Sequence, residues 1–413
     1  MDDPTPHLER FISYDQAIRE FQWQIPQRIN IGAAICGRHR DSITRIALSD
    51  VRIGGVNTYT FGALDYLSDK FATALSKNNI NPGDSVAVAL RPSAALAVAL
   101  LGILKIGGVV VPLSPTSTPD FVEYVLQASD PKVLVLDESL FLHFPVTKSR
   151  VHTDGTIFVV RDLRPTAGVP YKDFWSEVDR CSSEFTSAET ESDSPVFIFF
   201  IETKGEVSGI VHSVRSVICQ LAGFEFSNEF DDNAVFWVGD DWSSAASVLS
   251  TLYPAWWYGC SIVANSFERQ IPMVRLVNQS EVTNVFLRLK ATQGRDELST
   301  VVTSTSLNEI LGTPETGWII GNSRKWVESP FGSTYRVVPG RLVEVIDDGG
   351  NALPPGIVGK IAIHKSDPGL FTAYYGEVAD VSLGDWFLIG MSGYKTEGSA
   401  LRVVAESDRL QHI

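Results

Sequence analysis

The chain has 413 residues, of which 44% are hydrophobic and 20% are charged, so it is too long for one simple core and too apolar for a disordered chain. Its 34 lysines and arginines stand against 49 aspartates and glutamates, giving a formal net charge of −15. A chain this acidic repels phosphate backbones and anionic membranes, and the sequence contains no local basic patch that would reverse this. A fibrous repeat is also excluded.

The first half of the chain alternates segments with the patterns of buried strands and amphipathic helices. Thr60 is placed to cap a helix whose apolar residues recur every three or four positions. Strands and helices then alternate, with strands predicted at 86–90, 109–111 and 132–136 and helices at 94–106 and 119–129. Short loops between such segments indicate a parallel sheet with right-handed crossovers.

One stretch, 94–113, is nearly long enough and apolar enough to cross a bilayer. Lys105 and the pair Gly107-Gly108 divide it, so we favour a buried helix followed by a buried strand over a membrane span. The N-terminal segment MDDPTPHLERF is acidic and lacks the basic and apolar regions of a secretory signal. The four cysteines form no C-x-x-C pair, which suits a reducing compartment. We therefore expect a cytoplasmic protein.

The second half of the chain changes character twice. A polar run at 182–194 is interpreted as a solvated linker or loop. The alternating pattern then resumes, with strand candidates at 196–201, 234–238, 261–264 and 284–287. Beyond residue 335, glycine- and proline-rich turns separate short strands at 341–346, 358–364, 386–389 and 401–404. This predicts an α/β protein with two α/β subdomains, 1–190 and 191–335, and a β-rich barrel-like subdomain, 336–413.

Several segments, taken in order, resemble the N-terminal domain of the adenylate-forming (AMP-binding) superfamily, in particular acyl-CoA synthetases of the medium-chain and aromatic-acid type. They are FQWQIPQRINIG, the block 59–137, Asp241-Trp242, PAWWYG, VPGRLVEVIDDGGNALPPGIVGKIAI, DPGLFTAYYG and GDWFLIG. The resemblance implies two α/β subdomains and a small β-barrel. It also implies activation of a carboxylic acid by ATP to an acyl-adenylate, followed by transfer to CoA.

The segment that resembles the family's phosphate loop lacks most of the residues that the loop requires. The positions are Glu202, Thr203, Lys204, Gly205, Ser208 and Gly209. Glu202 replaces a glycine and Ser208 replaces the lysine that the resemblance implies. Glu202 and Glu206 are expected to face the polyphosphate, and a like-charge contact at about 4 Å costs about 4 kcal/mol at a dielectric constant near 20. Lys204 offsets part of this, and we interpret the segment as a solvated surface loop.

The other nucleotide motifs are altered as well. The turn expected to read Tyr-Gly-x-Thr-Glu is here Leu311, Gly312, Thr313, Pro314 and Glu315. The leucine removes an aromatic platform for adenine, and the proline removes a hydroxyl and a backbone donor. Glu315 is retained and would be a metal ligand only if Mg-ATP binds.

The last two motifs lie near the end of the chain. Met391 stands where the resemblance implies an aspartate on the ribose, and a thioether cannot supply a charge-assisted hydrogen bond. At the hinge motif, Glu406 replaces an arginine. The family's C-terminal domain, with its catalytic lysine, would begin near Ile413, where the sequence stops.

Our leading hypothesis is therefore a pseudoenzyme with a decayed ATP site and no catalytic residue, acting as a binding, regulatory or assembly partner. Its partner would be a related enzyme, an acyl-carrying protein or a second copy, and no cofactor is expected. The alternative is an enzyme. It would be an atypical acyl- or aryl-CoA ligase that uses ATP, Mg and CoA and receives a C-terminal domain in trans, or a protein whose inherited pocket performs ATP-independent chemistry.

A set of aromatic residues remains as candidate binding residues. The resemblance places Trp242, Trp256 and Trp257 at the acyl-pocket wall, where they would hold an acyl or aryl ligand. Ordinary core packing is the other interpretation of these three residues. The seven histidines form no metal-ligand pair at helical spacing.

Overall fold

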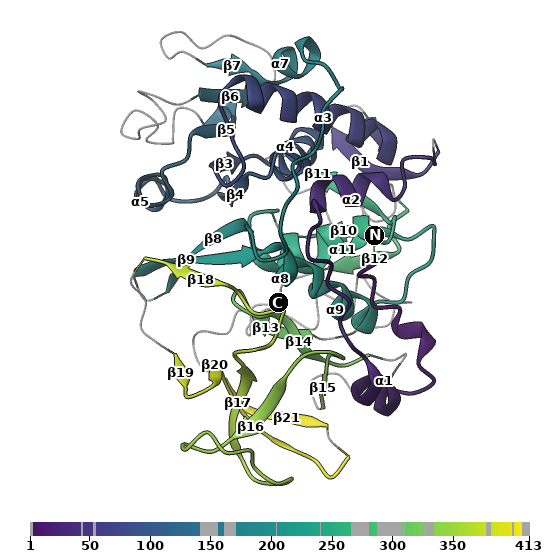
Figure 1. Ribbon diagram of the computed structural model, residues 1–413, viewed down its shortest axis with the longest axis vertical. Coiled ribbons are helices and arrows are strands. Elements are labelled where there is room, and N and C mark those ends of the chain that lie inside the picture. The colour runs from purple at the N-terminus through teal and green to yellow at the C-terminus, as the bar shows by residue number, and fades with distance from the viewer. Residues whose placement is uncertain are drawn as a thin grey trace.

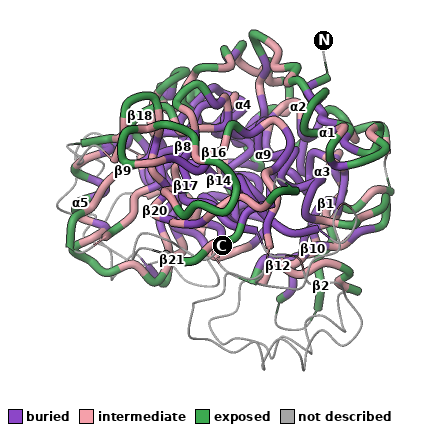
Figure 2. The backbone as a smooth tube through the Cα atoms, turned by 90° about the horizontal axis from the view of Figure 1, so that it is seen from below, coloured by how far each residue is buried: buried purple, intermediate pink, exposed green. Residues whose placement is uncertain are grey.

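The computed structural model describes residues 3–42, 44–52, 55–140, 156–160, 171–203, 205–239, 241–265, 281–286, 308, 310–323, 326, 334–376, 381–398 and 400–406. Two large sheets with helices between them form the upper and middle parts of the molecule in Figure 1, and a smaller sheet lies at the bottom. The buried residues, purple in Figure 2, run through the centre of the molecule.

The first large sheet has the strand order β18-β9-β8-β4-β3-β5-β6-β7. Its strands are β3 (Ser85–Ala89), β4 (Val109–Pro112), β5 (Val133–Asp137), β6 (Thr156–Val160), β7 (Lys172–Asp173), β8 (Pro195–Thr203), β9 (Glu206–Ser213) and β18 (Ala373–Tyr375). The strands from β8 to β7 in this order pair in parallel, while β9 and β18 are added antiparallel at one edge. The parallel sheet predicted for the first half of the chain is thereby confirmed.

The helices of this half begin at polar caps. They are α3 (Phe61–Lys77), α4 (Ala94–Lys105), α5 (Pro119–Ser129) and α7 (Phe174–Arg180), and the 3₁₀ turn η2 (Glu138–Leu140) follows β5. The predicted cap, Thr60, accepts a hydrogen bond from the backbone N–H of Ala63. Every residue of α4 is buried, and its Lys105 ammonium lies 2.7 Å and 2.6 Å from the carboxylates of Asp65 and Asp69. The helix predicted at 94–106 is therefore a core helix, and no helix among the described residues could span a membrane.

The second large sheet has the order β12-β10-β11-β1-β2. It consists of β1 (Ile46–Arg52), β2 (Gly55–Thr60), β10 (Val235–Val238), β11 (Ser261–Asn265) and β12 (Asn284–Phe286). Only β2 runs antiparallel to its neighbour. Other helical elements of the chain are η1 (Leu8–Arg10), α1 (Tyr14–Glu20), α2 (Ile31–Gly37), α8 (Val214–Ile218), α9 (Gln220–Ser227), α10 (Ala245–Ser247), the π-helix η4 (Val248–Leu252) and α11 (Tyr253–Trp257). The main hydrophobic core combines residues of α2, α3, α4 and α11 with residues of both sheets.

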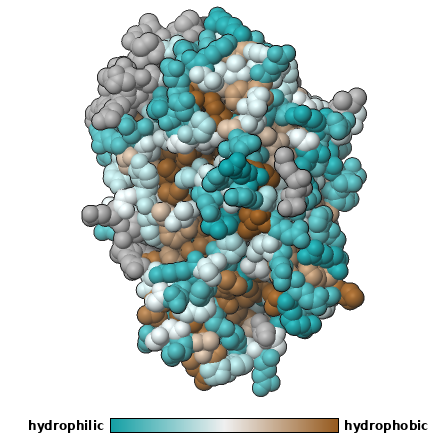
Figure 3. Space-filling model, viewed as in Figure 1, coloured by the Kyte–Doolittle hydropathy of each residue, from teal (hydrophilic) through white to brown (hydrophobic). Residues whose placement is uncertain are grey.

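The remaining strands form two small antiparallel sheets. One contains β13 (Ile310–Thr313), β14 (Gly317–Gly321) and β15 (Arg336–Val337), and the other contains β16 (Val343–Ile346), β17 (Gly359–His364), β19 (Ser382–Leu383), β20 (Trp386–Lys395) and β21 (Leu401–Glu406). Residues 347–350 form the predicted turn between β16 and β17, with Gly350 N–H donating to the Asp347 carbonyl at 3.2 Å. Apolar groups, brown in Figure 3, are visible over this lower part of the molecule. The exposed apolar residues there are Leu342, Ile357, Val358 and Val404.

The chain crosses between the sheets more often than its sequence indicates. Strands β1 and β2 pair into the sheet of β10, β11 and β12, and β8 and β9 extend the sheet of β3 and β4. Strands on both sides of residue 190 are thus shared between the two large sheets, and the subdomain boundaries at 190 and 335 stay predictions. The run 182–194 is irregular as expected, but it is held against the body, because Ala188 N–H donates to the Lys105 carbonyl at 2.8 Å.

Candidate functional site

The segment aligned with the phosphate loop forms a β-hairpin. Thr203 pairs with Glu206 and Ile201 pairs with Ser208, so only residues 204 and 205 connect the two strands. Gly205 adopts a positive φ of 83°, which favours glycine in so tight a turn. Lys204 lies outside the described residues. The expected solvated loop is replaced at this point by paired backbone.

The hairpin separates the two carboxylates that we expected to face the same ligand. Glu202 pairs with Val207, whereas Glu206 pairs with Thr203, and residues opposite each other in a ladder share a face. Neighbouring residues of a strand point to opposite faces, so Glu202 and Thr203 differ in face, and Glu206 shares the face of Thr203. The two exposed carboxylates of Glu202 and Glu206 therefore lie on opposite faces of the hairpin. In this register the two carboxylates cannot both contact the same polyphosphate, as we had expected them to.

The turn between β13 and β14 carries the second candidate motif, and glycines determine its shape. A Cβ on Gly312 would lie 1.8 Å from the carbonyl oxygen of Gly317, so only glycine fits there. Gly317 itself adopts a φ of 58°. The Thr316 hydroxyl lies inside the turn and accepts from Thr313 N–H at 2.9 Å. Pro314 lies at the first position after β13, and its carbonyl points toward the core.

A buried histidine joins this turn to the hairpin. His212 of β9 is fully buried, and its Nε2 lies 2.8 Å from the Pro314 carbonyl oxygen, while Nδ1 lies 3.1 Å from the Ser216 hydroxyl. Burial lowers the pKa of His212 to about 4, and the carbonyl contact opposes this while nearby Arg341 adds to it. The imidazole is therefore neutral near pH 7 and donates to Pro314 through Nε2.

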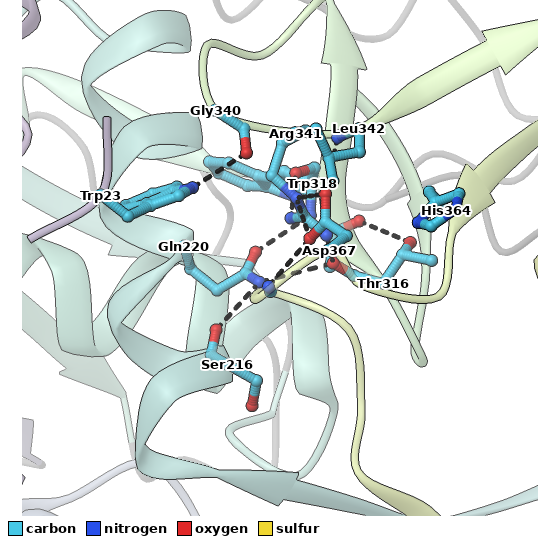
Figure 4. Close-up of polar contacts among 12 residues, drawn as sticks. Trp23, Ser216, Gln220, Thr316, Trp318, Gly340, Arg341, Leu342, His364 and Asp367 are labelled. Carbon is cyan, nitrogen blue, oxygen red and sulfur yellow. Dashed lines mark hydrogen bonds and ion pairs between the residues drawn. The ribbon is translucent and has the colours of Figure 1, made fainter. Parts of the chain in front are cut away.

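A second buried network holds the turn from the other side (Figure 4). The Arg341 guanidinium, fully buried, donates to the carbonyls of Thr316 and Trp318 at 2.9 Å each and pairs with the buried Asp367 carboxylate at 3.0 Å. Gln220 of α9 accepts from Trp318 N–H at 3.0 Å. Because the side chains of Gln220, Arg341 and Asp367 all have protein partners here, the network fixes the turn against α9 and the last sheet.

The retained acid of the motif lies at the edge of this network. Glu315 is half-buried, and its carboxylate accepts a hydrogen bond from the Tyr374 hydroxyl at 3.0 Å. Its backbone carbonyl accepts from Phe371 N–H at 2.8 Å, so the side chain and the backbone of Glu315 are both held by residues 371–374. Among the residues that the structure describes, no group of three or more His, Cys, Asp or Glu side chains is placed to hold a metal ion.

The two substituted nucleotide positions are part of an apolar core. Leu311 and Met391 are each only 2% exposed, and both belong to the cluster that also contains Ile320 and Ile361. Strand pairing sets Met391 opposite Ile361 and Leu311 opposite Ile320. The side chains expected beside adenine and ribose are thus packed together with other hydrocarbon side chains rather than around a polar opening.

Comparison with known proteins decides the family. Residues 38–287, more than half of the chain, match the family described as AMP-binding enzyme. The chain belongs to the AMP-binding enzyme family. It is 24% identical to the mitochondrial acyl-coenzyme A synthetase ACSM3 of Rattus norvegicus, and the match covers 97% of this chain and 76% of that protein.

Two further comparisons define the limits of the likeness. The chain is 23% identical to surfactin synthase subunit 2 of Bacillus subtilis over 82% of its own length, but it spans only 10% of that protein. A crystal structure of Brucella canis acyl-CoA synthetase superposes with a TM-score of 0.85 at 18% identity, covering 96% of this chain and 80% of that one. The fold class that we predicted, the α/β fold of the acyl-CoA synthetase N-terminal domain with several sheets and a small barrel-like sheet, is confirmed by this superposition.

The three tryptophans assigned by resemblance to the acyl pocket of AMP-binding enzymes are in the main core. Trp242, Trp256 and Trp257 are 2%, 0% and 3% exposed. Trp256 donates to the Ala47 carbonyl at 2.9 Å, and Trp257 donates to the Thr5 hydroxyl at 2.9 Å. These positions favour the core-packing interpretation over a partner surface.

A small apolar cavity does adjoin one of the three tryptophans. Trp257 is among its lining residues, which are otherwise Ile31, Ile35, Val217, Ile218, Leu221, Tyr253 and Pro254. Trp242 and Trp256 do not line it. Part of the expected pocket wall thus borders an apolar cavity between α2, α8, α9 and α11.

The sequence reasoning missed the polar residues that organise the site. His212, Gln220, Arg341 and Asp367 were not singled out, because each is isolated in the sequence and matches no catalytic spacing. The available signal was weak: Arg341 follows Pro339-Gly340 at the start of a resembling segment, where a charged residue precedes a buried strand. All four cysteines are buried and free.

Proposed function

We propose that this member of the AMP-binding enzyme family is an acyl-CoA synthetase-like protein that does not form acyl-adenylates and acts by binding, as a regulatory or assembly partner. The observation that carries the proposal is the burial of Leu311 and Met391 in one apolar cluster. A ribose needs hydrogen-bonding groups, whereas Leu311 supplies none and the Met391 thioether is only a weak acceptor. Opening this cluster would expose hydrocarbon surface to water, which costs about 25 cal/mol of free energy for each Å² exposed.

The hairpin supports the same proposal from the phosphate side. A triphosphate is normally held by a run of backbone N–H groups in a glycine-rich loop and by a lysine. Here Ser208 is paired in the ladder with Ile201, and Glu202 is an exposed anion at the expected glycine position. We infer that the described residues do not fit ATP, so no catalytic step is assigned to them.

The proposal is tested by ATP–pyrophosphate exchange. The purified chain would be incubated with Mg-ATP, labelled pyrophosphate and each of a panel of fatty and aromatic acids. We expect no exchange above the background without acid. Ser208→Lys, which restores the expected lysine, should also remain at background, because Leu311 and Met391 still fill the nucleotide side. Acid-dependent exchange by the unmodified chain would overturn the proposal.

One observation favours the alternative of a ligase that receives a C-terminal domain in trans. Glu315, the acid that would bind Mg, is retained and is half-buried rather than enclosed in the core. Repeating the exchange assay with a separately purified C-terminal domain of an acyl-CoA synthetase distinguishes the two functions. Exchange that appears only with the added domain and is lost in Glu315→Gln would establish the ligase.

A further inference from the structure

The outer face of the β8–β9 hairpin carries a row of three aromatic rings. Tyr124 of α5, Phe200 of β8 and Tyr375 of β18 lie edge to face, with ring centroids 6.5 Å and 6.1 Å apart. Tyr124 is 42% exposed and Tyr375 is 38% exposed, although both are large aromatic residues. The three segments are far apart in the sequence and meet at the left of Figure 1.

The row is held in place by the backbone beneath it. Gly209 lies in the ladder between Phe200 and Tyr375, and a Cβ there would be 2.7 Å from the Tyr375 Cβ and 3.0 Å from the Phe200 ring. The Tyr124 hydroxyl donates to the Val207 carbonyl at 3.3 Å. The rings therefore have fixed positions before any partner arrives, which reduces the entropy lost on binding.

Two exposed acidic residues, Glu202 and Asp120, lie on the elements that carry this aromatic row. Glu202 is exposed and shares the face of Phe200, because the two residues are separated by one position in a strand. On α5, Asp120 is exposed one turn before Tyr124 and therefore lies on the same side of the helix. Aromatic faces bordered by carboxylates attract cations, and a guanidinium stacks on such rings while pairing with an acid. The net charge of −15 acts in the same direction.

We propose that this aromatic row docks a basic segment of a partner protein, with arginine or lysine side chains over Tyr124 and Tyr375 and an ion pair to Glu202. This inference deepens the proposed function, since it names the docking surface and the charge of the partner segment. Its test uses no nucleotide, so it can fail independently of the exchange assay.

The test is a fluorescence anisotropy titration of a labelled peptide of alternating arginine and serine against the whole purified chain without nucleotide. We expect Tyr124→Ala and Tyr375→Ala each to weaken binding about tenfold, while Tyr124→Phe, which keeps the ring, stays within about twofold. The matched control is Tyr66→Ala on α3, where the tyrosine is 51% exposed. None of these substitutions changes the net charge, so general attraction to the acidic chain stays constant.

An equal loss in Tyr66→Ala, or no loss in the Tyr124 and Tyr375 variants, would overturn the proposal, because binding would then follow net charge alone. If the alanine variants fail to fold, the binding of Glu202→Gln is compared with that of Glu189→Gln. Glu189→Gln is the control, because it removes an exposed acid elsewhere on the protein. We expect only Glu202→Gln to weaken binding. Failure of this titration leaves the exchange assay unaffected, so the two proposals are refuted separately.

Discussion

Acid should weaken the protein through one buried histidine, His212. This residue joins β9 to the turn after β13, and its ring is fully buried between Pro314 and Ser216. Its pKa falls from 6.5 to about 4 on folding, chiefly because burial disfavours the charged imidazolium. At a pH between these two values, His212 is therefore mostly neutral in the folded chain and mostly protonated in the unfolded chain.

The sign and size of the effect follow from this difference in pKa. Between pH 6.5 and about 4 the unfolded chain binds one more proton at this site, so the free energy of unfolding decreases as the pH falls through that window. Each pKa unit corresponds to about 1.4 kcal/mol, and the whole shift therefore amounts to about 3 kcal/mol. Above pH 6.5 the contribution is constant.

Urea unfolding at pH 7 and pH 4 measures how the free energy of unfolding depends on pH. The unmodified chain is compared with His212→Gln. Glutamine keeps an N–H donor for the Pro314 carbonyl and does not titrate. We expect the loss of stability on acidification to be about 3 kcal/mol smaller in His212→Gln. His7→Gln, at an exposed histidine, is the control and should behave like the unmodified chain. An unchanged acid dependence in His212→Gln would refute this reasoning.

Three further substitutions test the packing of the candidate site by denaturant melts. Gly312→Ala should fold poorly or not at all, since its Cβ would meet a carbonyl oxygen at 1.8 Å, and native-like stability would contradict the turn geometry. Trp256→Ala should lower the free energy of unfolding by about 3–5 kcal/mol, whereas a surface role would leave it nearly unchanged. Arg341→Met should cost about 3–5 kcal/mol by leaving Asp367 buried and unpaired, and Arg341→Met with Asp367→Leu should recover part of that loss.

Local sequence patterns predicted the helices and strands of the parallel sheet well. α5 occupies residues 119–129 as expected, because Pro119 sets the first helical turn and Thr118 caps it. The strands at 86–90, 109–111 and 132–136 were found within one or two residues. Continuous apolar runs between polar turns are strong local signals, and they need no knowledge of distant partners.

Features that depend on distant pairing were not predictable in the same way. The phosphate-loop segment was expected to be an open loop, yet it forms a hairpin whose two strands pair with β4 and β18. Met391 was identified as a replacement, but its burial depends on the register between β17 and β20. The Arg341–Asp367 pair joins residues 26 apart, and no spacing rule marks such a pair.

The most direct test of the central claim is the unfolding temperature of the purified chain with and without millimolar Mg-ATP. A ligand at 100 times its dissociation constant adds about 2.7 kcal/mol to the free energy of unfolding. We predict that Mg-ATP gives no more stabilisation than buffer salts at matched ionic strength, because our proposal assigns the expected adenine and ribose positions to the buried apolar residues Leu311 and Met391. A saturable rise in the unfolding temperature that increases with ATP concentration would contradict the claim.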